Sequence, residues 1–398
     1  MEHALRDAGL DVVPVLGPKR DTLLPRGAVE VVLGRGAIRR RAKTIRRRVT
    51  RMRDEATPDA AVRRHLLEAR EGVSEMNHAI QKSGADVIFG CCVSRAISAI
   101  NATRPIVYFS DTTARLITTT YPAYIRRSAA YKRACDKLEQ TALDRADVTC
   151  FATEIARRSA IDLYECDPAR VHVAPMGAHI TPTDLDGPAA APPLPSRDNL
   201  EMVVTAADAE RKQTGLCVDI TAALRQRSIK AHLTIIGAGT PHSKGASFVT
   251  HAGRLSLAKP TDRAAHAAAL QRAHLALQPS LAEAFGIAPC EAAAFETPSV
   301  VSAAGGLAEV VQHDRTGLVL PIDASANDYA DAIESLVDSP DRYRAMSQAA
   351  LDRAERTLNW SSWGQSVARL IHHAAVDAPA HEVTIATAIR RRTLTPSF

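Results

Sequence analysis

Short apolar runs alternate with longer amphipathic stretches along most of the chain. In the first half, such runs predict strands at Val12–Leu16, Val29–Leu33, Asp86–Gly90, Ile106–Phe109, Val148–Phe151 and Val171–Ala174. The stretches between several of them, including 60–82 and 131–145, carry apolar residues at helical spacing. Strands that alternate with helices are typical of a parallel sheet built from βαβ units.

Residues 181–199 interrupt this alternation, because their prolines and small residues do not support a regular element. A second series of strands is expected at Met202–Ala206, His232–Ile236, Phe248–His251, Leu275–Leu277, Ser299–Val301 and Leu318–Leu320. Helices are expected at 214–226, 262–272, 287–295, 326–338, 341–357 and 360–373, and a loosely ordered polar tail is expected over 376–398.

This order of elements predicts an N-terminal domain over 1–180, a linker over 181–199 and a C-terminal domain over 200–358. The predicted fold class is α/β, with two doubly wound, Rossmann-like domains that face each other across a cleft. Nucleotides bind to such folds in crevices outside the carboxyl ends of the strands.

Composition narrows the class of protein. No apolar run reaches the length of about 18 residues that a membrane span needs. The charged start of the chain does not resemble a signal peptide, so a cytoplasmic protein is expected. The seven cysteines form no CxxC pair, and the histidines show no paired-ligand spacing, so no metal site is predicted. Asp184 and Asp186 form a DxD triplet, but it lies in the proline-rich linker and is expected to be solvated.

The net charge of +6 is concentrated in residues 37–53, where apolar residues recur at helical spacing between arginines and lysines. A basic amphipathic helix is therefore expected. It could simply dock by its apolar stripe and leave the basic face in solvent. It could also contact an anionic membrane, at the inner face, or an acidic acceptor. Nucleic acid is not an expected partner, because no aromatic residues for base stacking are interleaved with the charges.

The candidate chemistry is densest over residues 278–317. Glu283 is expected in the loop that leaves a strand, and Glu291 inside the helix that follows. Phe285 and Gly286 fall at the start of that helix, where free N–H groups favour oxyanions. A carboxylate accepts two hydrogen bonds from a vicinal diol, and amide-rich turns suit a diphosphate. The segment therefore predicts a site for a nucleotide sugar.

A second glycine pair, Gly305 and Gly306, follows the next strand and precedes a short helical turn that carries Glu309. Glycine at such a position permits close approach of the backbone to a ligand.

The whole segment resembles the donor-site signature of GT-B retaining glycosyltransferases, in particular the large group called family 4. The matching positions are Pro279, Ser280, Glu283, Phe285, Gly286, Glu291, Ala292, Ala294, Pro298, Val300, Gly305, Gly306, Glu309 and Gly317. The resemblance extends over roughly residues 85–375. It includes Trp360 and Trp363, which resemble the start of a last helix, over 359–375, that crosses back to the N-terminal domain.

The resemblance implies roles for these residues in a donor site. Glu291 would bind the ribose hydroxyls and Glu283 the transferred sugar. Backbone contacts to the sugar or the phosphates would come from Phe285, Gly286, Gly305 and Gly306, with Glu309 beside them. Lys212, with Arg211 next to it, would face the diphosphate of a UDP- or GDP-linked donor, so that neither a metal nor another cofactor is needed. The acceptor would be a sugar, a lipid or a small molecule.

Asp111 ends a predicted strand in the first half and is a candidate for contact with the acceptor or the reacting centre. An N-cap of the following helix is an equally open role for it. Enzymes of the resembled group are thought to use a front-face route, in which the leaving phosphate takes the acceptor proton.

The chain departs from the resembled pattern in four places. The strand and glycine-rich loop that normally begin the first domain are not recognised. Ala207 stands where an arginine is common, and Ala284 replaces a glycine. Glu296 replaces a helix-ending glycine and is expected to add local backbone strain. These departures keep a second hypothesis open beside the enzyme, namely a non-catalytic GT-B module that binds a nucleotide or a partner.

Overall fold

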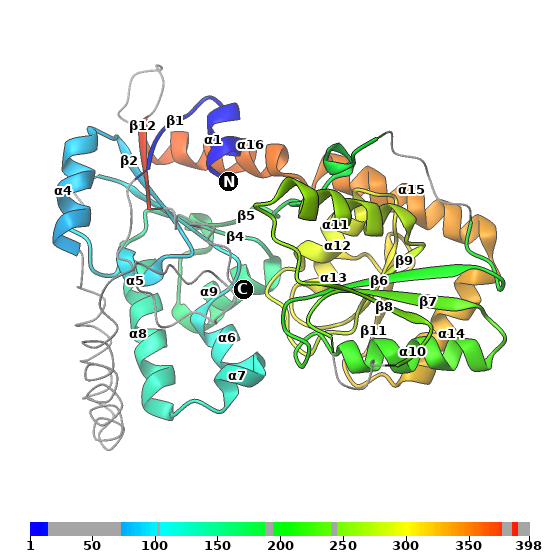
Figure 1. The fold of residues 1–398 in the computed structure, drawn as a ribbon. Helices are drawn as coiled ribbons and strands as arrows, with labels where there is room; N and C mark the ends of the chain where they lie inside the picture. The colour runs from blue at the N-terminus through cyan, green and yellow to red at the C-terminus, as the bar shows by residue number, and fades with distance from the viewer. Residues whose placement is uncertain (15–72, 102–103, 188–193, 240–244, 376–383, 389–398) are drawn as a thin grey trace, which may run out of the picture.

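The computed structural model describes residues 1–14, 73–101, 104–187, 194–239, 245–375 and 384–388. These residues form two parallel six-stranded sheets, one in each half of the chain, and Figure 1 shows the two halves side by side. The predicted strand Val29–Leu33 and the predicted basic helix over 37–53, with its membrane or acidic partner, lie outside the described residues and stay predictions. Within the described residues, no helix is long and apolar enough to cross a membrane.

The N-terminal sheet has the order β1-β12-β2-β3-β4-β5. Its strands are β1 (Asp11–Pro14), β2 (Val87–Cys91), β3 (Ile106–Ser110), β4 (Val148–Phe151), β5 (Val171–Val173) and β12 (Thr384–Ala388). The helices of this half are α1 (Glu2–Asp7), α4 (Val73–Ser83), α5 (Ser94–Ile97), α6 (Ala114–Thr120), α7 (Pro122–Ile125), α8 (Ala129–Arg145) and α9 (Glu154–Tyr164). The strands β2, β3 and β4 are buried along their whole length, which accounts for their unbroken apolar runs.

The strand β12 corrects the prediction of a loosely ordered tail over 376–398. Its residues pair in parallel with β1 on one side and with β2 on the other. The segment TIATA is rich in β-branched residues, and two neighbouring strands satisfy its backbone groups on both edges. The C-terminal end of the chain therefore contributes to the N-terminal sheet.

The C-terminal sheet has the order β11-β10-β9-β6-β7-β8. Its strands are β6 (Leu200–Ala206), β7 (Ala231–Gly237), β8 (Val249–Gly253), β9 (Leu275–Gln278), β10 (Ser299–Ser302) and β11 (Gly317–Leu320). Its helices are α10 (Thr214–Gln226), α11 (Pro260–Arg272), α12 (Ile287–Ala293), α13 (Leu307–Val310), α14 (Ala326–Val337) and α15 (Pro340–Arg356). The strand order reverses between β6 and β9, so the loops after these two strands diverge and leave a place for a ligand.

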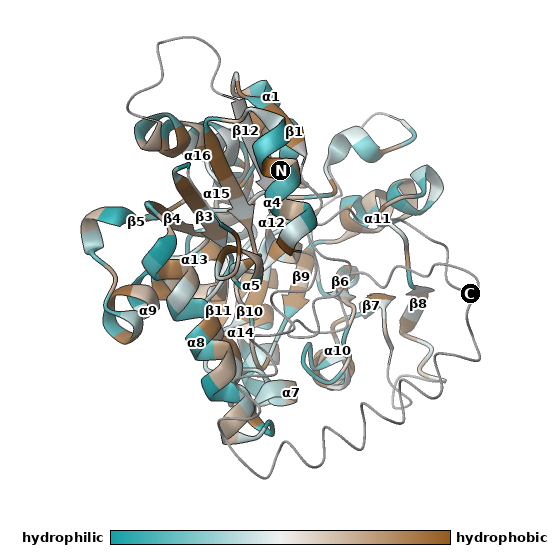
Figure 2. Ribbon diagram, turned by 90° about the vertical axis from the view of Figure 1, so that its left-hand side faces the viewer, coloured by the Kyte–Doolittle hydropathy of each residue, from teal (hydrophilic) through white to brown (hydrophobic). Residues whose placement is uncertain are grey.

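The last long helix, α16 (Trp360–Ala374), packs on α1 and on β2, β3 and β4 of the N-terminal half. Trp363 is fully buried there, edge-on to Phe89 and Phe109 at ring-centroid distances of 6.2 and 5.2 Å. The same apolar core reaches into the C-terminal half through residues such as Phe285 and Leu307. Figure 2 shows β3 and β4 as apolar strands inside a shell of more polar helices.

Most predicted elements agree with the structure to within two residues, and the α/β prediction with two Rossmann-like domains is confirmed. The predicted strain at Glu296 is also confirmed, because this residue follows α12 at a φ of 58°. The prediction of a solvated Asp184 is wrong. Its carboxylate accepts two hydrogen bonds of 2.8 Å from the guanidinium of Arg263 and also caps a short turn beginning at Thr181.

Candidate active site

Two loops meet at the point where the strand order of the C-terminal sheet reverses. One follows β6 and carries Arg211 and Lys212, and the other follows β9 and carries Glu283. The N–H of Leu281 donates to the carbonyl of Arg211 at 2.9 Å, and the amide of Gln213 donates to the carbonyl of Pro279 at 2.7 Å. These bonds hold the two loops at a defined separation.

The loops bring the predicted ionic residues into one cluster, which we call the Glu283 cluster. Arg211 and Lys212 each place a nitrogen 2.6 Å from Oε1 of Glu283. The hydroxyl of Ser280 donates to the same oxygen at 3.1 Å. All three charged side chains are largely covered, with side-chain exposures of 19% for Arg211, 10% for Lys212 and 9% for Glu283.

The charges in this cluster do not cancel. Burial alone would raise the pKa of Glu283, but the Lys212 and Arg211 charges and their hydrogen bonds hold it below its ordinary value. One carboxylate then faces two cations, so the cluster keeps a net positive charge beside a strand end. Such a cluster attracts an oxyanion with more than one charge, for example a diphosphate.

Glu291 lies on the second turn of α12 and is 4% exposed. Its carboxylate accepts hydrogen bonds from the backbone of His179 and Ile180, in the segment that connects the two halves of the chain. Burial raises the pKa of Glu291 to about 8, against the opposing effects of those bonds and of the Lys212 charge. The neighbouring His266 has a pKa lowered to about 4, chiefly by burial, so its ring is neutral. Glu291 and Glu283 are therefore both within electrostatic reach of Lys212.

The raised pKa of Glu291 predicts how the stability changes with pH. Because the folded protein holds this proton to a higher pH than the unfolded chain does, folding takes up a proton between the two pKa values. The free energy of unfolding should fall as the pH rises from about 5 to 8, by up to about 1.4 kcal/mol per pH unit for one group. Glu291→Gln should flatten this slope in melting curves recorded across that range. Parallel slopes for the wild type and the variant would contradict the assignment.

The glycine pair packs two loops of the protein against each other. Gly305 has a φ of 53°, and a side-chain carbon at this position would lie 1.9 Å from the carbonyl oxygen of Glu283. The same carbonyl accepts a hydrogen bond from the N–H of Gly306 at 3.3 Å. The close approach of the glycine backbone seen here is thus to the Glu283 loop. The predicted backbone contacts to a donor, from Phe285, Gly286, Gly305 and Gly306, stay predictions.

Glu309 reaches the other half of the molecule. Its carboxylate accepts hydrogen bonds from the N–H groups of Glu154 and Ile155, at 2.6 and 2.8 Å, at the start of α9. A carboxylate at a helix N-terminus is stabilised by the free amides and by the helix dipole. In this structure Glu309 therefore links the two domains, while its predicted place in the donor site remains a prediction.

Asp111 follows β3 directly, on the N-terminal side of the site. Burial raises its pKa to about 6, and the charge of Glu283 adds to the rise. This coupling places the Asp111 carboxylate within electrostatic reach of the Glu283 cluster. Thr113 caps α6, since its hydroxyl accepts from the N–H of Leu116, so the cap role left open for Asp111 is filled by Thr113.

Tyr121 is a site residue that the sequence analysis missed. It lies between α6 and α7, and its ring faces the guanidinium of Arg211. The distance from Cζ of Arg211 to the centroid of the Tyr121 ring is 5.5 Å. The backbone of Ala284 hydrogen-bonds to its hydroxyl, and burial together with the Glu283 and Asp111 charges raises its pKa. The ring covers Arg211 from the opposite domain, so Tyr121 holds this cation in place.

Removal of this ring should weaken the binding of an anionic ligand. A cation–π contact at a partly covered site corresponds to about threefold to thirtyfold in binding. Tyr121→Ala should weaken nucleoside-diphosphate affinity by a factor in this range, whereas Tyr121→Phe should stay near the wild type. Phe248→Ala is a matched control, because Phe248 makes a similar contact with Arg225 at 5.3 Å. Equal affinities of Tyr121→Ala and this control, measured by calorimetry, would contradict the role of Tyr121.

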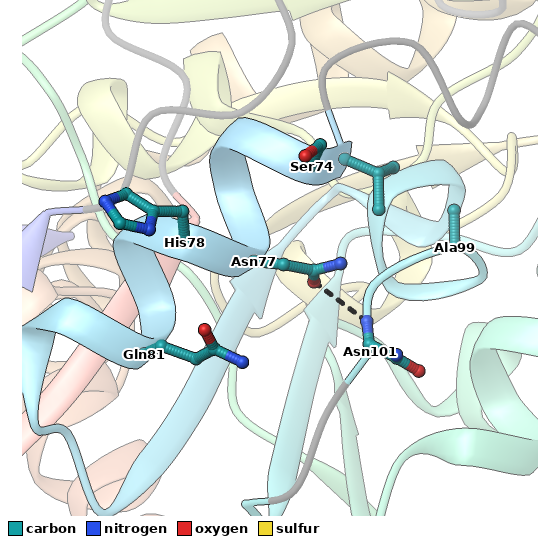
Figure 3. A pocket seen from close by; sticks show the side chains of 7 residues that line it. Ser74, Asn77, His78, Gln81, Ala99 and Asn101 are labelled. Carbon is teal, nitrogen blue, oxygen red and sulfur yellow. Dashed lines mark hydrogen bonds between the residues drawn. The ribbon is translucent and has the colours of Figure 1, made fainter.

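Among the described residues, no group of three or more His, Cys, Asp or Glu side chains is arranged to hold a metal ion. A separate open pocket of about 640 Å³ lies beside α4. Figure 3 shows its lining, which includes Ser74, Asn77, His78 and Gln81, and the hydrogen bond of 2.8 Å from the N–H of Asn101 to Asn77. The described residues that line it include no Asp, Glu, Lys or Arg, unlike the Glu283 cluster.

Solved structures share this arrangement of two domains. Sucrose-phosphate synthase from Thermosynechococcus elongatus superposes with a TM-score of 0.58 over 77% of this chain and 79% of that chain, at 18% identity. Anabaena HepE, solved in complex with UDP and glucose, gives a TM-score of 0.55 over 75% of this chain and 80% of that one, at 16% identity. The chain has the GT-B fold.

The sequence comparisons also find similarity to glycosyltransferases. Residues 192–353 of this GT-B chain match the family described as glycosyl transferases group 1. A D-inositol 3-phosphate glycosyltransferase of Kineococcus radiotolerans is 30% identical over 273 residues, which cover 61% of this chain and 60% of that protein. The chain thus spans about 60% of the length of the curated relatives that it matches first.

Proposed function

We propose that the chain transfers a hexose from a nucleoside-diphosphate sugar to a sugar, lipid or small-molecule acceptor, without a metal ion and with retention at the anomeric carbon. The observation that carries this proposal is the Glu283 cluster at the strand-order reversal of a GT-B fold. The family match over 192–353 covers the whole cluster. HepE was solved with UDP and glucose, which are the two parts of a UDP-glucose donor.

The site must stabilise the charge that develops when the donor's glycosidic bond breaks. As the bond between the anomeric carbon and the diphosphate oxygen breaks, negative charge accumulates on the leaving diphosphate. Lys212 and Arg211 would stabilise that negative charge. In other enzymes a bound metal ion has this role. Glu283, released from its ion pairs, would then accept hydrogen bonds from the hydroxyls of the sugar, and Glu291 would accept those of the ribose.

The acceptor side needs no strong base in this proposal. The oxygen of the acceptor hydroxyl bonds to the anomeric carbon on the face that the diphosphate leaves, and its proton passes to the leaving phosphate oxygen. Asp111 would orient the acceptor hydroxyl, since its carboxylate lies on the N-terminal side of the cluster. This route retains the anomeric configuration. It is the front-face route that enzymes of the resembled group, family 4, are thought to use.

The experiment is a panel of UDP- and GDP-linked sugars incubated with the protein, with nucleoside diphosphate release measured in the presence and absence of EDTA. We expect slow release from at least one donor, at the same rate with EDTA. A rate abolished by EDTA would overturn metal independence. Binding without release would favour the non-catalytic module, and absence of both would overturn the nucleotide-sugar site.

A further inference from the structure

A second cavity lies in the N-terminal half of the chain, with Asp111 in its lining. It encloses about 70 Å³ at the carboxyl ends of β2 and β3, under α6, α7 and α8. We call it the Glu139 pocket and define it by its lining: Cys92, Ser94, Arg95, Tyr108, Ser110, Asp111, Thr112, Ala114, Ile117, Thr118, Tyr124, Cys135, Leu138 and Glu139. The enclosed space suits one end of a small molecule rather than a whole nucleotide.

Several polar side chains are part of the lining of this pocket. Glu139 is 4% exposed, and its carboxylate accepts hydrogen bonds from the hydroxyls of Tyr108, at 3.3 Å, and Ser94. Burial raises its pKa to about 7, a rise to which the Asp111 charge contributes. Arg95, 7% exposed, also lines the pocket. A carboxylate offers about four acceptor positions, so Glu139 retains capacity for further hydroxyl donors.

Much of the remaining lining is apolar. Ala114, Ile117 and Leu138 line it from α6 and α8, and the ring of Tyr124 lines it from α7. A wall of this kind fits the C–H face of a saturated ring, while the carboxylates bind its hydroxyl edge. Sugars and cyclitols have both of these faces.

Asp111 relates the pocket to the proposed donor site, because it is part of the pocket lining. The Asp111 carboxylate raises the pKa of Glu139 on one side, and its own pKa is raised by the Glu283 charge on the other. The pocket and the Glu283 cluster therefore share Asp111 as a neighbour. A molecule held by Glu139 would present its outer hydroxyl at Asp111, next to the transferred sugar.

We propose that the Glu139 pocket is the acceptor subsite and that it takes an unphosphorylated sugar or cyclitol ring. This inference rests on the proposed glycosyl transfer and adds the acceptor class and the residue Glu139. The lining holds one guanidinium beside two carboxyl groups and leaves little enclosed space, so a phosphate dianion would lose its hydration there without a surplus of cations to replace it. Relatives such as the Kineococcus protein are named for a phosphorylated cyclitol, which makes the predicted preference of this chain a distinguishing property.

The test uses the donor that the nucleotide-sugar panel identifies, with glucose and myo-inositol as acceptors and glucose 6-phosphate and inositol 3-phosphate as their charged counterparts. We expect an unphosphorylated ring to have at least about tenfold higher kcat/KM than its phosphate. A preference for the phosphorylated member, or no transfer to either unphosphorylated ring, would overturn the acceptor class.

Variants test the pocket itself. Glu139→Gln should raise the acceptor KM about tenfold, because the amide puts an NH2 donor in place of one acceptor oxygen. Ala114→Leu should do the same by filling the pocket, without a change in charge. Glu75→Gln, on the exposed side of α4, is the matched control. Unchanged acceptor KM in both pocket variants would overturn the subsite.

Two further readouts separate this inference from the proposed function. Donor hydrolysis without an acceptor and nucleoside-diphosphate affinity should stay at wild-type values in both pocket variants, which also reports that they fold. If the wild-type protein neither binds nor hydrolyses any donor, the proposed function fails, and the acceptor subsite fails with it. If donor hydrolysis persists while the pocket variants leave acceptor KM unchanged, only the acceptor subsite fails.

Discussion

Lys212→Met should lower the turnover of the nucleotide sugar by about 100-fold to 1000-fold, the range found when one preorganised charge-stabilising group is removed. The lysine nitrogen lies 2.6 Å from Glu283 and has little exposure to water. Its interaction with the leaving diphosphate strengthens as the bond breaks, so the loss should appear mainly in kcat rather than in KM. Lys212→Arg should not keep the full rate, because a planar guanidinium does not fit the place of a compact ammonium.

The control for this variant is Lys230→Met. Lys230 is 71% exposed and pairs with Asp198, which is 84% exposed, so its removal changes the net charge by the same amount without touching the site. Steady-state rates and melting curves of both variants distinguish a catalytic loss from a folding defect. A Lys212→Met enzyme that keeps more than about a third of the wild-type kcat would show that this cation does not stabilise the leaving group.

Glu283→Gln should destabilise the ligand-free protein and make it more responsive to nucleotide. The substitution leaves Arg211 and Lys212 side by side with little solvent, and breaking a buried ion pair costs about 3–5 kcal/mol. Arg211 is partly exposed, so we expect the lower part of that range or somewhat less, about 2–3 kcal/mol. A diphosphate replaces the missing negative charge, so UDP or GDP should raise the melting temperature of the variant more than that of the wild type.

The pH dependence gives this prediction a second readout. The folded-state pKa of Glu283 lies below its ordinary value, so its contribution to stability is present above about pH 4.5 and is lost as the pH falls through the folded-state pKa. The difference between wild type and Glu283→Gln should shrink in acid accordingly. Glu210→Gln is the control, because Glu210 is an exposed carboxylate in the same loop. Equal nucleotide-induced shifts in both variants would contradict the charge replacement.

The fold was predictable where local sequence determines structure. Strand β9 and helix α12 follow from a short apolar run, a break at Pro279 and Gly286, and an alanine-rich helix. The strain at Glu296 was predictable because a glycine is expected at that position in the resembled signature. The grouping of Arg211, Lys212 and Glu283 followed from the same signature.

The features that were missed depend on contacts distant in sequence. The five residues of β12 gain their order from β1 and β2, which precede them by about three hundred residues or more. Tyr121 lies in an unremarkable run of threonines, and its partner Arg211 is 90 residues away. Glu139 looks like an ordinary helix residue until Tyr108 and Asp111 are placed beside it. No local pattern contains these pairings.

A structure of the protein with a bound, unreactive nucleotide-sugar analogue tests the central claim most directly. We expect a diphosphate oxygen at hydrogen-bond distance, about 3 Å, from Nζ of Lys212, with the ion pair to Glu283 opened. The ribose hydroxyls should bond to Glu291 in the same complex. A nucleotide bound elsewhere, with Lys212 still paired to Glu283, would contradict the account.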